Sequence, residues 1–473
     1  MKILVNNIFT ILIVAAISLF VSCENKTGQE HTSPRRIKAY VTTFTKEELL
    51  KESEITSETS DSIISVINVD STQQYQTIDG FGYTLTGGSA MLLSKMTPNV
   101  RQKLINELFG TTNEAIGVSY LRISIGSSDL DEFPFSYDDL EDGETDSELE
   151  HFSLAYDTLY LIPMLKEITQ KAPGLKILGS PWSPPKWMKT NNNTIGGSLK
   201  PEFYSSYAAY FVKYIKAMEA EGIIINAVTV QNEPLHPGNN PSMLMLPEAQ
   251  KVFVRDYLGP AFELEKIKTK IVIYDHNADR PDYPMTILND PEASKYIDGS
   301  AFHLYGGDIS ALSYVHKLHP DKNLYFTEQW VGAPGDFARE MQWHTENLII
   351  GATRNWCKTV LEWNLASDLQ QNPHTNGGCD RCLGAVTISN DLVIRNPAYY
   401  IIAQASKFIP AGSVRIFSNV PKDIPNVAFK TPDGKIILIA QNSLEKEQVF
   451  TLLLNQIEIP VTIPAKAVVT YVY

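Results

Sequence analysis

Residues 227–240 read AVTVQNEPLHPGNN, an apolar stretch that ends abruptly in polar residues. The first four residues are apolar or β-branched, as in a buried strand, and Gln231, Asn232 and Glu233 follow them directly. Pro234 prevents a central strand from continuing, because proline has no amide hydrogen to give to a sheet. We therefore predict a buried strand at 225–233 whose last residues carry an amide and a carboxyl group beyond the edge of a sheet.

The same pattern occurs eight times between about residue 75 and residue 410. Short apolar strands end in polar residues and alternate with segments of helical periodicity, such as PEFYSSYAAYFVKYIKAMEAEG at 201–222. Apolar strands separated by helices are typical of a parallel sheet covered on its outside. The sequence therefore predicts an α/β fold, a (β/α)₈ TIM barrel over 76–409. Its predicted strands are 76–86, 118–126, 175–183, 225–233, 270–277, 299–306, 322–330 and 357–365.

The two ends of the chain indicate a second domain. Residues 410–473 contain short strands joined by turns, including TPDG at 431–434, without a helix-length segment between them. Residues 38–75 also have the composition of strands. We predict an additional antiparallel β-sandwich that combines 38–75 with 410–473 and lies beside the barrel.

The N-terminus has the composition of an export signal. Residues 1–22 carry one charge, Lys2, and an apolar run that is shorter than the about 20 residues of a membrane-spanning helix. Cys23 follows small and apolar residues, a pattern similar to the lipobox of bacterial lipoproteins. We expect a lipoprotein-type signal peptide at 1–22, a lipid on Cys23, a polar tether at 23–37 and a location on the bacterial cell envelope. The alternative is an ordinary secretion signal with an incidental cysteine.

Composition excludes some partners. The net charge is −14, and no basic stripe with interleaved aromatic residues is present, so we expect no nucleic acid partner. The acidic run YDDLEDGETDSELE at 137–150 is predicted to be a solvated loop that includes Asp138 and Asp139. It lacks the spacing of an EF-hand, and calcium is not predicted there. We expect a monomer.

Two cysteines, Cys379 and Cys382, lie in the glycine-rich stretch TNGGCDRCLGAVTI. A structural zinc site needs four ligands and only His374 is near, while a thioredoxin-like motif needs a short βαβ context that is missing. An exported protein can form disulfides, and a local disulfide is therefore favoured. Cys357, in an apolar strand, is interpreted as a buried thiol.

Polar and aromatic residues gather where the predicted barrel strands end, the edge at which TIM barrels carry their active sites. Two carboxyls can supply an acid and a nucleophile for glycosidic cleavage, and aromatic faces can stack on sugar rings. The strand ends therefore predict a carbohydrate site. The residues at these ends are Arg122, Trp182, Asn232, Glu233, His276, His303, Tyr305, Glu328, Glu362 and Trp363.

Several motifs, taken in order, resemble glycoside hydrolase family 30. QNEP and FTEQW, which contain Glu233 and Glu328, resemble the acid/base and nucleophile signatures of retaining barrel glycosidases. DGFG at 79–82, SPWSPPKWMKTN at 180–191, FHLY at 302–305 and EWNLA at 362–366 are similar to family 30 motifs. The resemblance covers about residues 65–473. The family includes glucosylceramidases and microbial β-glucanases that have a β-sandwich beside the barrel.

The resemblance implies a role for each matching position. Glu233 would be the general acid/base, Glu328 the nucleophile, and Asn232 a partner of the sugar 2-hydroxyl. No metal or organic cofactor is implied. The positions that would line the first sugar subsite are Arg122, Asp129, Trp182, His303, Tyr305 and Trp363.

The chain departs from the glucosylceramidase pattern at two places. Gln329 and Trp330 stand where glucosylceramidases have small residues, and the GGCDRC loop at 377–382 is additional. Both departures resemble the endo-β-1,6-glucanase branch of the family. We therefore predict a retaining β-1,6-glucanase, with Trp330 as a stacking residue.

Structural roles remain open for the same residues. Glu233 could cap a loop, and Glu328 could form a buried ion pair with Arg122. Asp129 could serve a turn. Aromatic residues and histidines could simply pack, namely Trp182, Trp330, Trp363, His276 and His344.

Two alternative functions are also compatible with the sequence. One is an exo-acting β-glucosidase or glucosylceramidase of the same family. The other is a surface glycan-binding lipoprotein without catalysis. Such a binding module would not need both Glu233 and Glu328, so their joint presence favours an enzyme.

Overall fold

The computed structural model describes residues 37–54, 65–454 and 456–473. The predicted signal peptide, Cys23 and the tether up to residue 36 lie outside these residues. Within the described part of the chain, no helix combines the length and the apolarity that crossing a membrane requires.

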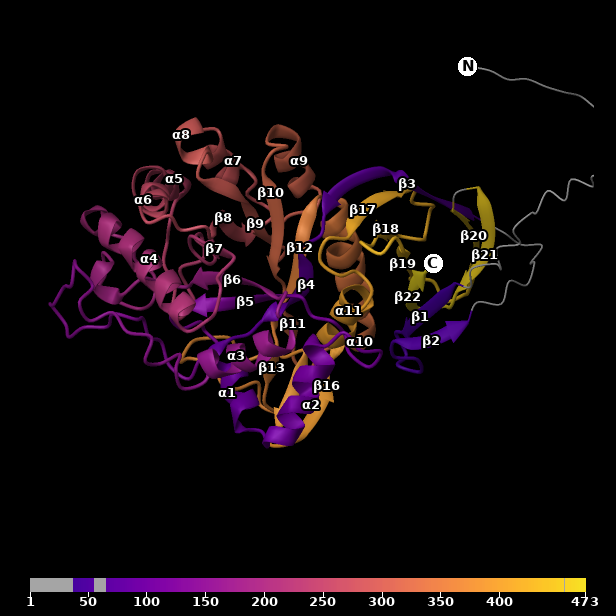
Figure 1. Ribbon diagram of the computed structural model, residues 1–473, viewed down its shortest axis with the longest axis horizontal. Coiled ribbons are helices and arrows are strands. Elements are labelled where there is room, and N and C mark those ends of the chain that lie inside the picture. Colours follow the sequence, from indigo (N-terminus) through magenta and orange to yellow (C-terminus); the bar gives the residue numbers. More distant parts are fainter. Residues whose placement is uncertain (1–36, 55–64, 455) are drawn as a thin grey trace, which may run out of the picture. The chain divides into compact units, whose positions relative to one another are not determined.

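Eight parallel strands close into the predicted barrel, in the order β10-β12-β4-β5-β6-β7-β8-β9 (Figure 1). Each strand pairs in parallel with its neighbour, as for Tyr120 with Lys176 and Ile125 with Pro181. The TIM-barrel prediction is confirmed. The barrel strands are β4 (Gly80–Thr84), β5 (Tyr120–Ile125), β6 (Lys176–Pro181), β7 (Ala227–Thr229), β8 (Lys270–Asn277), β9 (Ile297–His303), β10 (Asn323–Glu328) and β12 (Cys357–Asn364).

Strand β7 is shorter than the predicted 225–233. After Thr229 the chain keeps to the barrel wall through single hydrogen bonds, from Asn232 N–H to Pro181 O (2.8 Å) and from Glu233 N–H to Asp275 O (3.0 Å). The regular hydrogen bonding of β7 thus ends at Thr229, but the backbone continues in the direction of the strand and brings Asn232 and Glu233 to the carboxyl end of the barrel.

Helices cover the outside of the barrel (Figure 1). In α4, the buried Tyr207, Tyr210, Phe211 and Tyr214 recur at spacings of three and four, which gives the helix one broad apolar face. The helices are α1 (Gly87–Lys95), α2 (Pro98–Phe109), α3 (Leu161–Lys171), α4 (Tyr204–Ala220), α5 (Pro247–Phe253), α6 (Gly259–Leu264), α7 (Asp282–Leu288), α8 (Pro291–Ser294), α9 (Ala311–Leu318), α10 (Phe337–His344) and α11 (Pro397–Ser406). Short 3₁₀ turns lie at Lys186–Met188 and Pro201–Phe203, and π-helical segments at Val254–Leu258 and Thr345–Ala352.

The barrel interior is built in layers that the strand period sets. One layer is apolar and takes one residue from each of seven strands: Tyr120, Leu178, Ala227, Val272, Ala301, Tyr325 and Leu361. Side chains in a strand return to the same face every second residue. Two residues further along, the next inward layer is therefore polar, with Arg122, Ser180, Thr229, His303 and Thr327. This polar layer forms the floor of the site described below.

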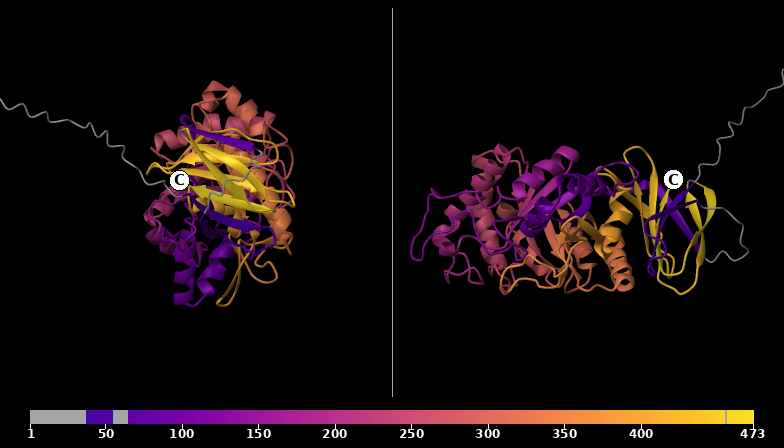
Figure 2. Two further views of the ribbon diagram at one scale, coloured as in Figure 1. Left: turned by 90° about the vertical axis from the view of Figure 1, so that its right-hand side faces the viewer. Right: turned by 90° about the horizontal axis from the view of Figure 1, so that it is seen from below.

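Both ends of the chain contribute to a nine-stranded sheet of order β2-β1-β22-β19-β18-β17-β3-β20-β21. The N-terminal strands lie among the C-terminal ones (Figure 1, Figure 2). Side chains of these strands enclose an apolar core that includes Ile67, Leu438 and Val469. The prediction of a β-sandwich formed from both chain ends is confirmed. Its strands are β1 (Lys38–Thr43), β2 (Lys51–Glu54), β3 (Ser65–Thr77), β17 (Val414–Ser418), β18 (Asn426–Lys430), β19 (Ile436–Asn442), β20 (Gln448–Leu454), β21 (Ile457–Ile463) and β22 (Ala467–Val472).

Alternating residues of the sandwich strands also pack against the barrel helices. Ile437 and Val468 belong to the barrel core, whereas their chain neighbours Leu438 and Val469 belong to the sandwich core. Gln404 of α11 receives a hydrogen bond from Thr470 (2.6 Å) and donates one to Thr42 (2.7 Å). The remaining short strands lie in the loops of the barrel: β11 (Val331–Gly332), β13 (Ala366–Ser367), β14 (Cys382–Leu383), β15 (Val386–Ser389) and β16 (Leu392–Arg395).

Candidate active site

Arg122 is the centre of the polar layer at the carboxyl end of the barrel. Its side chain is fully buried, and one guanidinium nitrogen donates to Glu328 Oε2 at 2.5 Å. The other nitrogen donates to Asn232 Oδ1 (2.6 Å), Asp275 Oδ2 (2.8 Å) and Ser180 Oγ (3.2 Å). The guanidinium thus joins side chains from four different strand ends into one rigid network. The ion pair between Glu328 and Arg122, an open structural alternative from the sequence, is present.

Glu233, which follows β7, and Glu328, which ends β10, face one another. One carboxylate oxygen of Glu233, one of Glu328 and a ring nitrogen of His303 lie within 4.8 Å of one another. Glu233 has a backbone φ of 43°, a left-handed conformation that costs energy for a residue with a side chain. The ladder between β9 and β10 is irregular between Phe326 and Glu328. Both glutamates are therefore directed by local departures from regular strand geometry.

His303 lies between two carboxylates. Its Nδ1 is 3.1 Å from Glu233 Oε1, and its Nε2 is 3.1 Å from Asp275 Oδ1. A carboxylate accepts hydrogen bonds, so both ring nitrogens must carry protons to satisfy this geometry. Burial opposes that charge, but Glu328, Asp275 and Glu233 together raise the pKa of His303 to about 9. An imidazolium is therefore expected at neutral pH, and it has no lone pair to offer a metal ion.

Asp275 connects the network and was not identified from the sequence. It is fully buried and accepts hydrogen bonds from Arg122, Ser180 (2.8 Å) and Thr327 (2.6 Å). Burial alone would raise the pKa of Asp275, but Arg122 and His303 hold it well below its usual range. The ladder of β8 shifts between Tyr274 and His276, so the extra residue points inward out of the regular alternation. Two consecutive positive φ values, at Tyr274 and Asp275, mark this bulge.

The two glutamates are electrostatically coupled. Burial raises the pKa of Glu328, and the charge of Glu233 raises it further, while His303 and Arg122 partly offset both effects. For Glu233 burial acts in the same direction, but the neighbouring His303 keeps its pKa below the usual range. Two carboxylates this close cannot both ionise freely, and they titrate as one pair.

An open cleft of about 460 Å³ lies over these residues. Trp182 and Trp363 stack at 5.3 Å between ring centroids, and the Arg122 guanidinium lies 4.7 Å above the Trp182 ring. Both indoles are nearly buried, whereas Tyr305 is 40% exposed and Trp330 is partly exposed. The Trp182 indole nitrogen has no hydrogen-bond partner among the described residues, which leaves a donor beside the cleft. The cleft lining is Asp129, Trp182, Asn232, Glu233, His236, Asn239, His276, Asn277, Tyr305, Glu328, Trp330, Trp363, Cys379 and Cys382.

The disulfide loop forms one side of this cleft. Cys379 and Cys382 are bonded, with their Cα atoms 5.7 Å apart. The Cys379 N–H donates to Asp129 Oδ2 at 3.2 Å. Burial, aided by the charge of Glu328, raises the pKa of Asp129 to about 7. Cys357 is a buried free thiol.

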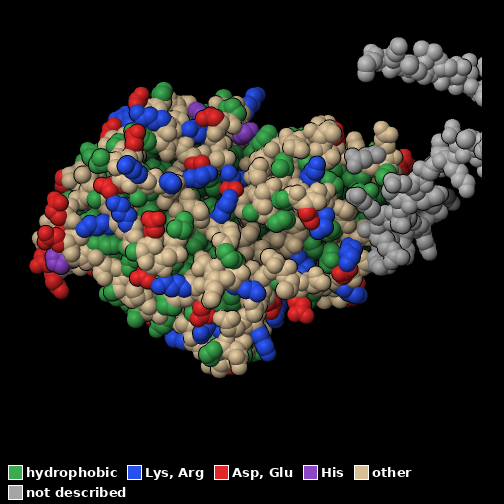
Figure 3. Space-filling view, viewed as in Figure 1, with side chains coloured by type: hydrophobic (Ala, Val, Ile, Leu, Met, Phe, Trp, Pro, Cys, Tyr) green, Lys and Arg blue, Asp and Glu red, His purple; other side chains and the backbone are tan. Residues whose placement is uncertain are grey.

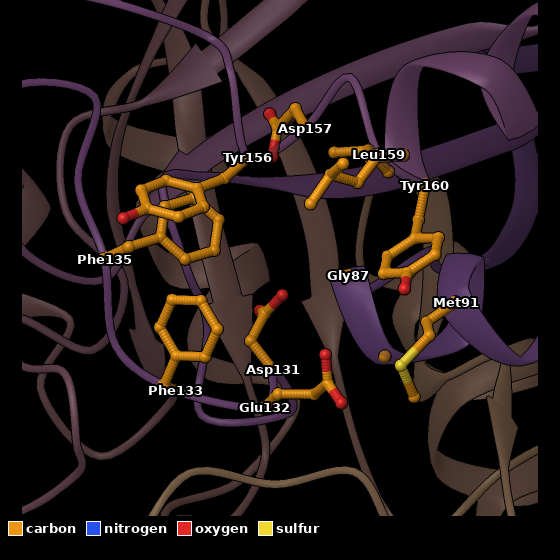
Figure 4. Close-up of a pocket in the computed structure, with 12 residues that line it drawn as sticks. Gly87, Met91, Asp131, Glu132, Phe133, Phe135, Tyr156, Asp157, Leu159 and Tyr160 are labelled. Carbon is orange, nitrogen blue, oxygen red and sulfur yellow. The ribbon is translucent and has the colours of Figure 1, made fainter.

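A second hollow is lined by residues 131–135, residues 156–161 and the start of α1 (Figure 4). There Asp131 Oδ2 accepts hydrogen bonds from Ser128 N–H (2.7 Å) and Ser128 Oγ (2.9 Å), which close the turn that contains Asp129. A Cβ atom at Gly87 would lie 1.7 Å from Asp131 Oδ1, so the close approach requires glycine. The hollow thus supports the loop of the cleft without containing the paired glutamates.

Two histidines for which packing was an open role have polar partners. His276 lines the cleft, with Nε2 3.9 Å from Glu233 Oε1. His344 pairs with Glu362 (2.7 Å) and Glu340 (3.1 Å) behind the barrel wall. Glu362, although at a strand end, is therefore held by His344 and does not line the cleft.

The acidic run was predicted wrongly at Asp138. This residue is 1% exposed, whereas Asp139 is exposed as expected. The neighbouring Tyr137 inserts against α4, with its ring centroid 5.6 Å from that of Tyr214, and draws Asp138 below the surface. The many acidic residues of this run predict a solvated loop, and the sequence does not show that Tyr137 packs on a helix and buries the start of the run.

Comparison with known proteins identifies the family. The model of the glycosyl hydrolase family 30 TIM-barrel domain matches residues 78–409, and that of the family 30 β-sandwich domain matches residues 412–471. The chain belongs to glycosyl hydrolase family 30. This family 30 chain is thus a glycosyl hydrolase, and its substrate is a carbohydrate.

Individual relatives include endo-1,6-β-D-glucanases and glucosylceramidases. The endo-1,6-β-D-glucanase of Aspergillus fumigatus is 35% identical over 404 residues, which cover 80% of each chain. The lysosomal acid glucosylceramidase of Mus musculus is 29% identical and covers 80% of this chain and 78% of its own. A solved structure of an endo-β-1,6-glucanase superposes with a TM-score of 0.86 at 35% identity and covers 93% of this chain and 99% of its own.

Proposed function

We propose that this family 30 hydrolase is an endo-β-1,6-glucanase that cleaves with retention of configuration. The observation that carries the mechanism is the placement of Glu233 and Glu328, whose nearest oxygens lie within 4.8 Å. Retaining glycosidases hold their carboxyls about 5–5.5 Å apart, and inverting enzymes hold them about 6.5–9.5 Å apart to admit a water molecule. The substrate assignment is supported by the similarity to endo-1,6-β-glucanases.

In the first step, Glu328 is the nucleophile. Arg122 and Tyr305 donate to its two oxygens, at 2.5 Å and 3.0 Å, and hold the carboxylate beneath the cleft. Glu328 attacks the anomeric carbon and forms an ester while Glu233 gives its proton to the departing sugar oxygen. In the free protein the pKa of Glu328 is raised and that of Glu233 is lowered, the reverse of what these roles need. Positive charge on the bound sugar favours ionised Glu328, so the proton of the coupled pair resides on Glu233 in the reacting complex.

In the second step, Glu233 takes a proton from water, and the oxygen of that water attacks the anomeric carbon and releases Glu328. The Asn232 Oδ1 atom is occupied by Arg122, so its amide N–H groups are oriented towards the cleft and available to the sugar 2-hydroxyl. Trp330 and Tyr305 have partly exposed aromatic faces on which further glucose rings of the substrate can stack.

The mechanism is tested by the configuration of the first product. NMR of a β-1,6-glucan digest should show a β-anomer before mutarotation, and an α-anomer would exclude the retaining mechanism. Glu233→Ala should slow hydrolysis of β-1,6-glucan far more than that of an activated aryl glycoside, because a good leaving group needs little protonation. Equal losses on both substrates would contradict the acid role of Glu233.

The substrate is tested with a panel of β-1,6-, β-1,3- and β-1,4-glucans and glucosylceramide. Oligosaccharides released only from β-1,6-glucan are expected. Release of single glucose units from the chain end would favour the exo-acting alternative, and cleavage of glucosylceramide alone would favour the group of the lysosomal relative. Tight glucan binding without any product would favour the non-catalytic binding protein.

We further propose export and lipid anchoring at Cys23 to the bacterial cell envelope. The support is the apolar run before Cys23 and the polar segment after it. In the bacterial host, wild-type protein should incorporate a labelled fatty acid and fractionate with membranes, and Cys23→Ser should do neither. Label retained by Cys23→Ser would contradict the proposal.

A further inference from the structure

The loop between β5 and α3 contains a buried carboxylate, that of Asp138, whose oxygens are not hydrogen-bonded to any described residue. Asp138 is 1% exposed, and neither carboxylate oxygen has a hydrogen-bond partner among the described residues. A buried polar group of this kind is costly without a partner, and a charged one more so. Protonation would not remove the need, because a carboxylic acid requires an acceptor for its O–H group.

Asp146 and His151 surround Asp138. The three side chains each offer one potential ligand atom, and these atoms lie within 4.8 Å of one another. Asp146 Oδ2 accepts hydrogen bonds from the His151 N–H (2.8 Å) and lies 2.9 Å from His151 Nδ1. The arrangement combines two carboxylates with one imidazole, a set of donors that binds metal ions.

The neighbouring lysine does not meet the need of Asp138. Lys213 Nζ donates to the carbonyl oxygens of Glu148 (3.0 Å) and Leu149 (2.6 Å). Further out, exposed acidic side chains of residues 141–150 form a patch at the edge of the molecule (Figure 3). The surroundings therefore favour a cation from solution.

We propose that Asp138, Asp146 and His151 bind a divalent cation of the zinc type. Zinc accepts both carboxylate oxygen and imidazole nitrogen and commonly takes three protein ligands with water in the fourth position. The His151 side chain is 68% exposed, so solvent reaches that position. Calcium and magnesium fit less well, because they prefer sites built of oxygen ligands only.

Such an ion would fasten two loops of the barrel mouth. The Asp138 carbonyl accepts a hydrogen bond from the Trp187 indole at 2.9 Å, and Lys186 pairs with Asp142 at 2.7 Å. Trp187 and Lys186 follow β6, the strand whose end carries the cleft residue Trp182. The bound cation would stabilise this connection without contacting the glutamate pair.

The test compares melting temperatures of the chelator-treated full chain with and without ZnCl₂ or CaCl₂. Zinc should raise the melting temperature of the wild type, and of the control Glu144→Gln, by at least about 2 °C. Asp138→Asn and His151→Gln should lose most of this shift, and calorimetric titration of Asp138→Asn should show one zinc site fewer. Without metal, Asp138→Asn should melt at or above the wild type, because a buried unpaired carboxylate is removed.

Three results would overturn the proposal. The first is an equal zinc shift in wild type and Asp138→Asn, which would place the ion elsewhere. The second is a shift with calcium that His151→Gln leaves intact. The third is the absence of any shift or titrated site with either ion. His151→Gln changes an exposed side chain, so it remains informative if Asp138→Asn does not fold.

Discussion

The two ends of the barrel differ in how their carboxylates are paired with positively charged side chains. At the amino end, Asp79 pairs with Lys176 (2.6 Å) and Lys358 (3.1 Å), and Asp298 pairs with Lys270 (2.9 Å). At the carboxyl end, four buried carboxyls surround only Arg122 and His303 among the described residues: Asp129, Glu233, Asp275 and Glu328. Each of these carboxylates at the amino end has its own lysine partner, whereas the four carboxyls at the carboxyl end share one guanidinium and one imidazolium.

The difference separates stability from function. Balanced, partly exposed ion pairs help to hold strand ends together at modest energy. Concentrated buried carboxylates oppose folding, but they stabilise a sugar ring that becomes positively charged in the transition state. The strained φ at Glu233 and the bulge at Asp275 occur at the same end. Departures from favourable local structure thus coincide with the proposed chemistry.

The largest expected effect is that of Glu328→Gln at the carboxyl end. Turnover on β-1,6-glucan should fall by at least about 10⁴-fold, because an amide cannot form the ester intermediate. The free energy of unfolding should stay within about 1 kcal/mol, since Arg122 keeps Asp275 as a partner and one repelling charge is removed. Enzyme kinetics and urea unfolding measure the two effects. A large loss of stability would show that Glu328 is mainly structural.

Asp275→Asn should have the next largest effect. The side chain is fully buried, so it acts by positioning Arg122 and by keeping His303 charged. We expect kcat to fall about 10²–10³-fold, with little change in KM. The alkaline limb of the pH–rate profile should also move to lower pH, because Asp275 helps to raise the pKa of His303. An unchanged pH profile would indicate a structural role only.

The pH dependence of stability should also distinguish the two ends. The pKa of His303 is raised to about 9, so its contribution is complete below about 6.5, the usual value when unfolded, and is lost as the pH rises towards 9. That loss is on the order of 3 kcal/mol, at about 1.4 kcal/mol for each unit of pKa difference. The pKa of Asp298 is lowered, mainly by Tyr325 and Lys270 against the effect of burial. Its contribution is present above about 3.9 and is lost as the pH falls.

Urea unfolding between about pH 2 and about pH 9.5 measures both limbs. Asp298→Asn should flatten the acid limb and leave the alkaline limb in place. Flattening of the alkaline limb by this variant would contradict the separation of the two ends.

The smallest effect is expected for Asp79→Asn at the amino end. It should lower the free energy of unfolding by about 1–2 kcal/mol, because two lysines lose their partner at a partly buried site. Activity on β-1,6-glucan should stay within about twofold, since this end of a TIM barrel does not carry the active site. A strong loss of activity with unchanged stability would contradict the assignment of a purely stabilising role to the amino end.

The sequence by itself determined the architecture and the position of the glutamate pair. Apolar strands that end in polar residues predict a parallel barrel, and alternation with period two places Arg122 and His303 on the inner face. Pro234 ends the ladder and so marks Glu233. These signals are local, because strand periodicity and proline chemistry depend on neighbouring residues only.

Only the tertiary structure decided which side chains of the site form hydrogen bonds and ion pairs with one another. Arg122 and Glu328 are 206 residues apart, and nothing local in either segment specifies their pairing. Asp275 faces inward only because a bulge in β8 breaks the alternation, and Asp138 is buried only because Tyr137 packs on a helix of the next unit. Bulges, long-range ion pairs and burial depend on partners that folding brings together, so they could not be predicted from local pattern.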